Sequence, residues 1–209
     1  MDTETDLIFL LDPGHGGVIN GQPQTNGKRS PAWRDMPIVF EGEFNRAIVD
    51  IIERVAPAFD VNCINLVPTK EDWPLRQRVD AANALAARNP ENIYIYVSIH
   101  ANAGGGKGVE VFTSPGTTAS DPIATKFLES MSCNLPDVKL RLDLTDGDPD
   151  KEAAFFVLTK TTMPAILTEN FFMDNEEECR KWLNNKHGRG QIAMAHLAAM
   201  TEITKEVLG

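Results

Sequence analysis

The sequence has few cysteines, fewer basic than acidic residues, and no long apolar run. Its three cysteines lie far apart without a CxxC spacing, which excludes a disulfide framework or a thiolate zinc site and predicts free thiols. No segment approaches the ~18 apolar residues that a membrane-spanning helix needs, so membrane insertion is not expected. Twenty basic against thirty acidic side chains give a net charge of −10, which disfavours nucleic acid as a partner.

The N-terminal residues MDTETD are acidic and polar, whereas a secretory signal begins with a basic segment followed by an apolar one. We therefore expect either synthesis without export or prior removal of a signal. With 209 residues, 42% of them hydrophobic, the chain is long enough for one substantial domain and short for two. The prediction is one domain over residues 1–209, with residues 1–6 flexible and the molecule a monomer.

Strand and helix patterns alternate along the chain. Leu7–Leu11 is a short apolar run without polar alternation, typical of a central strand covered on both faces. The runs Ile93–Ile99 and Ala165–Thr168 predict further strands. Apolar residues recur with a helical period from Glu41 and over Leu75–Ala87. This alternation predicts a single α/β domain.

Two histidines follow predicted strands. His15 lies in a glycine-flanked turn just after the first strand, and His100 directly follows the strand predicted at Ile93–Ile99. Open α/β sheets place ligands outside the carboxyl ends of their strands, so both histidines are candidates for one site. Glu41 begins the helix reached from the first loop. Two imidazoles and one carboxylate are the protein ligands of many catalytic zinc sites, with the fourth position left to water.

The identity of the carboxylate ligand stays open at this point. Glu41 and Glu43 both fall in the first helical turn, where either could simply complement the helix dipole. A third acid, Glu169, ends a predicted strand instead of lying on a solvated helix face. Beside a metal, Glu169 would act as a general base that takes a proton from water and passes it to a leaving amine. No HExxH-type motif ties these residues together.

Residues Ile19–Met36 are rich in Gly, Pro, Asn, Gln and Ser, which predicts a long irregular loop. Long loops in compact domains are often functional. The loop carries four cationic or aromatic side chains, which are Lys28, Arg29, Trp33 and Arg34. It is either a solvated surface loop or a rim that grips an anionic or sugar-bearing substrate. Arg29, Trp33 and Asn102 are the candidate substrate-binding residues.

Six sequence blocks follow one another along nearly the whole chain. They are DPGHGG at 12–17, EGEFN at 41–45, LRQRVDAAN at 75–83, SIHANA at 98–103, GVEVF at 108–112 and MPAILTENFFMDN at 163–175. In this order they resemble the blocks of the zinc-dependent N-acetylmuramoyl-L-alanine amidases of the amidase-3 type. An ordered match over most of the chain is far more specific than any single motif.

The resemblance implies a mostly parallel, mixed central sheet flanked by helices on both faces. It also implies one Zn²⁺, and the implied ligands are His15, Glu41 and His100. Glu41 is preferred to Glu43 because it stands four residues before Asn45, as the family acid stands before the helix asparagine. Glu169 is implied as the catalytic acid/base.

The implied reaction is cleavage of the amide that joins the lactyl group of N-acetylmuramic acid to L-alanine. Peptidoglycan or a muropeptide is then the expected partner, and the cell wall or periplasm the expected place of action. Two other functions remain open, a zinc peptidase acting on another amide of the stem peptide and a non-catalytic wall-binding module. The presence of Glu169, which mere binding does not need, disfavours the second.

Overall fold

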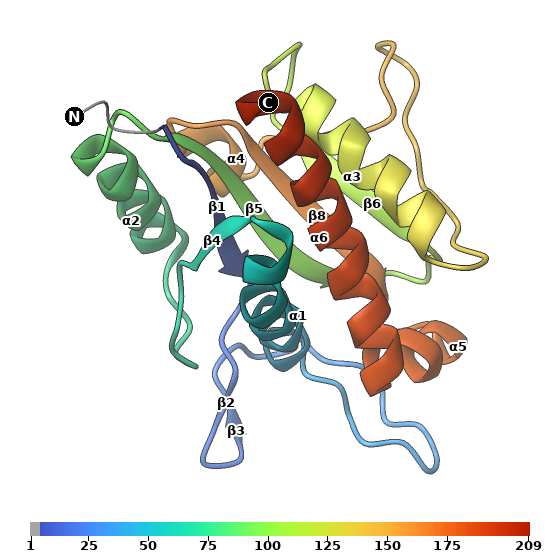
Figure 1. The fold of residues 1–209 in the computed structure, drawn as a ribbon. Coiled ribbons are helices and arrows are strands. Elements are labelled where there is room, and N and C mark those ends of the chain that lie inside the picture. The colour runs from blue at the N-terminus through green and yellow to red at the C-terminus, as the bar shows by residue number, and fades with distance from the viewer. Residues whose placement is uncertain (1–4) are drawn as a thin grey trace.

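Six strands form the central sheet of the computed structural model, which describes residues 5–209 (Figure 1). The strands are β1 (Leu7–Pro13), β4 (Asn62–Asn65), β5 (Ile93–Asn102), β6 (Val109–Thr113), β7 (Lys151–Glu152) and β8 (Ala165–Phe172). Their order is β4-β1-β5-β8-β6-β7. The first four in this order run parallel, and β6 lies antiparallel to β8. The sheet is therefore mixed and mainly parallel, which confirms the prediction.

Helices cover both faces of this sheet (Figure 1). They are α1 (Glu41–Val55), α2 (Leu75–Arg88), α3 (Asp121–Asn134), α4 (Phe156–Lys160), α5 (Glu176–Glu178) and α6 (Lys186–Leu208), with a 3-10 turn at Ala56–Phe59 and a π turn at Cys179–Leu183. The α1, α3 and α6 helices share one core cluster, and α2 and α4 share the other. Within the described range, no helix is both long and apolar enough to cross a membrane.

The central strands are apolar throughout because both of their faces are covered. On β1, Phe9 packs into the α1/α3/α6 cluster, whereas Leu10 packs into the α2/α4 cluster. Val97 and Tyr96 on β5 divide in the same way. Successive strand residues point to opposite faces, so a strand covered on both sides shows no polar alternation. The central strand predicted at Leu7–Leu11 is thus confirmed.

The two strands that carry site residues run further than predicted. β5 continues through His100 to Asn102, and β8 continues through Glu169 to Phe172. His100 and Glu169 are register partners, so pairing between the strands extends both of them. The register then shifts between His100 and Asn102, and Phe171 has a positive φ of 64°. Both site residues consequently lie inside strands, not just after them.

The segment predicted as a long irregular loop begins with a hairpin. Its two strands are β2 (Val18–Ile19) and β3 (Gln22–Pro23). Asn20 and Gly21, with φ of 50° and 77°, make the tight turn that a two-residue hairpin requires. Strands of two residues leave no periodic pattern, which is why the sequence did not reveal them.

Two further predictions concern the cysteines and the N-terminus. All three cysteines are free thiols, as predicted. The flexibility predicted for residues 1–6 falls in part on residues 1–4, which lie outside the described residues. The backbone N–H of Asp6 donates to Asn92 Oδ1 at 3.1 Å, and its carbonyl accepts from Ile93 at 2.8 Å.

Candidate metal centre

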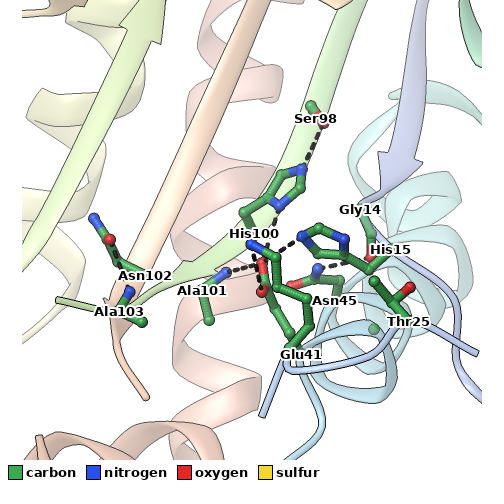
Figure 2. A network of polar contacts seen from close by, with 12 residues as sticks. Gly14, His15, Thr25, Glu41, Asn45, Ser98, His100, Ala101, Asn102 and Ala103 are labelled. Carbon is green, nitrogen blue, oxygen red and sulfur yellow. Dashed lines mark hydrogen bonds and ion pairs between the residues drawn. The ribbon is translucent and has the colours of Figure 1, made fainter. Parts of the chain in front are cut away.

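His15, Glu41 and His100, called here the His/Glu/His cluster, lie together at the carboxyl end of the central sheet. β1 leads into His15, the neighbouring β5 carries His100, and α1 begins at Glu41. His15 Nε2 lies 3.3 Å and His100 Nδ1 lies 3.0 Å from Glu41 Oε1. Figure 2 shows the three side chains pointing toward one another. The sequence prediction of one shared place for these residues agrees with this geometry.

The donor set suits a zinc ion in both chemistry and spacing. Ligand atoms about 2.0–2.2 Å from a tetrahedral metal lie ~3.4 Å apart, close to the measured separations from Glu41. One donor atom from each of the three residues lies within 4.8 Å of the others. Across residues 5–209, no other group of three or more His, Cys, Asp or Glu side chains has such geometry. The cluster therefore fits a metal with nitrogen and oxygen ligands.

Glu41 rather than Glu43 faces the histidines. Glu43 Oε1 accepts from the backbone N–H of Val18 at 2.6 Å and lies 3.2 Å from the Lys70 ammonium. Burial raises the pKa of Glu41, but hydrogen bonds from the two histidines outweigh it and hold the pKa well below its usual range. Glu41 is thus ionised, which is the state that binds a cation.

The backbone at His15 is strained and held in place from several sides. His15 has a φ of 62°, a left-handed conformation that costs roughly 1–2 kcal/mol for a residue with a Cβ. Arg46 donates to the His15 carbonyl at 2.8 Å, and Asn45 donates to the Gly14 carbonyl at 2.9 Å. A Cβ on Gly14 would lie 2.1 Å from the ring of His100. Glycine at this position therefore allows the two histidines to approach.

A chain of hydrogen bonds supports His100 on the other edge of its ring. His100 Nε2 lies 3.2 Å from Ser98 Oγ, and Ser98 Oγ donates to Asp12 Oδ2 at 3.0 Å. The Tyr96 hydroxyl donates to the same carboxylate oxygen at 2.6 Å, and the buried Arg78 guanidinium pairs with the other. Because the Ser98 proton points to Asp12, its lone pair accepts from Nε2–H. With Nε2–H held in this way, Nδ1 is the nitrogen that would offer its lone pair to a metal once the proton it shares with Glu41 is displaced.

Glu169 lies next to His100 on the adjacent strand. Its Oε2 is buried and, among the described residues, has no hydrogen-bond partner. Burial raises the pKa of Glu169 to about 7; nearby His100 opposes the rise, and Glu41 adds to it. Both protonation states are then populated at neutral pH, which suits a group that first accepts and later donates a proton. The neighbouring Asn170 donates to the His100 carbonyl at 2.9 Å.

A cavity of about 640 Å³ opens beside the cluster. His15, His100 and Glu169 line its polar part. Its apolar wall includes Trp73, Leu75, Phe155 and Phe156. This size and this mixture of a broad apolar wall with a few polar groups are typical of small-molecule sites.

The three predicted substrate-binding residues do not line this cavity. Arg29 is exposed beside a separate hollow, and Trp33 packs half-buried against the core. Asn102 Nδ2 donates to Glu110 Oε1 at 2.5 Å. Their roles stay predictions. Lys28, which neighbours Arg29, lines the cavity instead.

Sequence reasoning also missed the residues that support the cluster from behind. Asp12, Ser98 and Arg78 each lie within a block that the family resemblance had already marked. Their polar side chains are buried, and a buried charge needs a partner. A signal was therefore present, but nothing in the sequence stated which of them pair.

The fold and the cluster together define an α/β domain with a candidate metal centre at the carboxyl end of its sheet. The family model described as N-acetylmuramoyl-L-alanine amidase matches residues 9–202, and the chain belongs to this family.

Two curated relatives illustrate the similarity in sequence. The chain is 31% identical over 173 residues to the N-acetylmuramoyl-L-alanine amidase CwlM of Bacillus licheniformis, covering 83% of this chain and 59% of the relative. It is 34% identical over 174 residues to the sporulation-specific N-acetylmuramoyl-L-alanine amidase of Bacillus subtilis (strain 168), again covering 83% and 59%. The chain thus spans about three fifths of the length of these relatives.

Solved structures share the fold. The N-acetylmuramoyl-L-alanine amidase from Clostridium difficile 630 superposes with a TM-score of 0.75 at 22% identity, covering 97% of this chain and 98% of that one. Ami1 from Mycobacterium smegmatis gives a TM-score of 0.74 at 18% identity, covering 98% and 100%. At these identities, the comparison establishes the architecture.

Proposed function

We propose that this chain is a zinc-dependent hydrolase that cleaves the amide bond between N-acetylmuramic acid and L-alanine of peptidoglycan. The observation that carries the proposal is the meeting of His15, Glu41 and His100 beside a cavity that Glu169 also lines. Membership of the amidase family and the names of the curated relatives support the choice of substrate. This substrate would place the activity at the cell wall.

The chain's own residues divide the work of the reaction. Zinc in a site of two imidazoles and one carboxylate acts as a Lewis acid and makes water reactive at neutral pH. Glu169 accepts a proton from the attacking water as its oxygen bonds to the lactyl carbonyl carbon. The same carboxyl then donates that proton to the L-alanine nitrogen as the carbon–nitrogen bond breaks. The products are a lactyl carboxylate and a free amine.

Hydrolysis of purified sacculi tests this function. Wild-type protein should release peptides with a new amino terminus on L-alanine, a chelator should stop the release, and added zinc should restore it. Chelator-resistant cleavage would overturn the role of the metal.

The position of the new termini separates the competing functions. New amino termini on residues other than L-alanine would identify a peptidase of the stem peptide. Retention on sacculi without any new terminus would identify a binding module. Either result would replace the proposed reaction.

A further inference from the structure

Lys28 brings a positive charge to the cavity beside the His/Glu/His cluster. Its ammonium Nζ lies 3.9 Å from Glu41 Oε2, and 48% of its side chain is exposed. Arg78 also lines the cavity, but its side chain is 2% exposed and its guanidinium binds Asp12 and the Trp73 carbonyl. Of the two described basic side chains that line the cavity, Lys28 is therefore the one whose N–H groups remain available to a ligand.

A short antiparallel ribbon fixes the position of Lys28. The backbone N–H of Glu41 donates to the Lys28 carbonyl at 3.0 Å. Two residues further along, Ser30 N–H donates to the Val39 carbonyl at 2.8 Å, and Val39 N–H donates to Ser30 Oγ at 3.0 Å. Because the ribbon ends at the first residue of α1, Lys28 is tied to the same backbone position as a member of the cluster.

The charge arrangement favours an anion at this place. The separation of 3.9 Å between Lys28 Nζ and Glu41 Oε2 is longer than a normal hydrogen bond. The ammonium N–H groups therefore stay available to a ligand. The other oxygen of Glu41 already faces both histidines. In a chain of net charge −10, a cation held here attracts an anionic ligand into the cavity.

We propose that Lys28 binds the free carboxylate that a stem peptide carries on the residue after L-alanine. The inference rests on the proposed function and deepens it. When that residue is D-glutamate linked through its side chain, its α-carboxylate lies within two residue lengths of the scissile amide, at most ~3.3–3.6 Å per residue. A carboxylate at this distance from a scissile amide bound at the cluster can reach a lysine that lies beside the cluster. The chain therefore selects the free acid over its amidated form.

The apolar wall supports the same orientation of the substrate. Trp73 and Phe156 pack against the core cluster of α2 and α4, whereas Lys28 lies in the loop that pairs with the first residue of α1. The apolar surface and the cation thus come from different parts of the chain. Methyl and C–H groups of the sugar can pack on the aromatic surface while the peptide carboxylate pairs with the ammonium.

Two muropeptides that differ in one group test the inference. N-acetylmuramoyl-L-alanyl-γ-D-glutamyl-L-lysine carries the free α-carboxylate, and N-acetylmuramoyl-L-alanyl-D-isoglutaminyl-L-lysine carries an amide in its place. Wild type should prefer the acid about tenfold in kcat/KM, as expected for loss of one charge-assisted hydrogen bond. Lys28→Met should lose about tenfold on the acid, mainly through KM, and less than about twofold on the amide.

Lys107 supplies a matched control. Its side chain is 47% exposed, it pairs with Glu177, and it does not line the cavity. Lys107→Met should change neither substrate preference nor kcat. Titration calorimetry with the product L-alanyl-γ-D-glutamyl-L-lysine gives a readout without turnover, and its binding should weaken about tenfold in Lys28→Met alone.

The possible outcomes test the role of Lys28 separately from the amidase reaction. Equal losses on both substrates, or a wild type without preference for the acid, would overturn the role of Lys28 while leaving the amidase reaction intact. A fall in kcat on both substrates would instead assign the lysine to the reacting carbonyl oxygen. A wild type that cleaves neither muropeptide at L-alanine would overturn the proposed function itself.

Discussion

His100, which is partly buried, and His196, which is fully buried, are two imidazoles with opposite electrostatic surroundings. His196 on α6 is fully buried, its Nδ1–H donates to the Ile192 carbonyl at 2.9 Å, and its Nε2 lies 3.0 Å from Thr168 Oγ1. Burial lowers its pKa to about 4. Burial also lowers the pKa of His100, but the hydrogen bond to Glu41 together with the negative charges of Glu41, Glu169 and Asp12 outweighs it, and the net pKa is raised.

The comparison shows that burial alone does not make a histidine functional. His196 contacts a hydroxyl and a carbonyl, so it is a neutral residue of the core. His100 meets a carboxylate and borders a cavity. β8 separates the two roles, because Thr168 faces His196 and the next residue, Glu169, faces the cavity.

Removal of either imidazole gives the sharpest contrast. His100→Ala should lower hydrolysis of sacculi on the order of 10³-fold or more, because a metal site with two remaining ligands no longer retains its ion. His196→Ala should keep the activity of the folded protein within about twofold and reduce its stability instead. Metal content by elemental analysis and thermal melting measure the two effects. Equal activity losses in both variants would erase the contrast.

Glu169→Gln separates proton transfer from metal binding. The amide cannot accept a proton, so turnover should fall about 10²–10⁴-fold. Zinc affinity, measured by competition with a chromophoric chelator, should change little because Glu169 is not in the His/Glu/His cluster. A variant that keeps full activity would remove Glu169 from the reaction.

Ser98→Ala tests the hydrogen-bond chain behind His100. Loss of the hydroxyl frees the Nε2 edge of the ring, and we expect zinc affinity to fall about 10–100-fold. Ser98→Thr, which retains a hydroxyl, should recover most of the affinity. If Ser98→Ala bound zinc as tightly as wild type, the chain from Asp12 would have no part in orienting His100.

The pH dependence of the free energy of unfolding should show the lowered pKa of His196. Its pKa is lowered from 6.5 to about 4, so the unfolded chain binds more protons between these values. The contribution to the free energy of unfolding is fully present above pH 6.5 and falls by about 3 kcal/mol as the pH drops to 4. Urea unfolding of wild type and His196→Gln at several pH values measures it. A constant difference between the two proteins would contradict the assignment.

The sequence predicted those site residues that follow buried apolar runs. His15 and His100 could be located because parallel strands bring their carboxyl ends to one edge of the sheet. The choice of Glu41 over Glu43 needed the spacing within a family block. Glu43 instead contacts the Val18 N–H and Lys70. Val18 belongs to a hairpin whose strands are too short to show a periodic pattern in the sequence.

Features set by tertiary contacts were not predictable. Lys28 and Arg29 are adjacent cations in a polar loop, and only the ribbon to α1 determines that Lys28 lines the cavity. The helix α4 (Phe156–Lys160) spans little more than one turn, which is too short for an apolar period to predict a helix. The helix α6 begins at Lys186 because the Asn185 side chain accepts from the His187 N–H as its cap, a contact that no apolar period indicates.

The central claim is that one ion is held by side chains from three different elements. Anomalous diffraction at the zinc absorption edge, on crystals grown with zinc, tests it most directly. The account predicts one peak about 2.0–2.2 Å from His15 Nε2, His100 Nδ1 and a carboxylate oxygen of Glu41. A zinc peak coordinated by Glu43, or no peak between the two histidines, would contradict it.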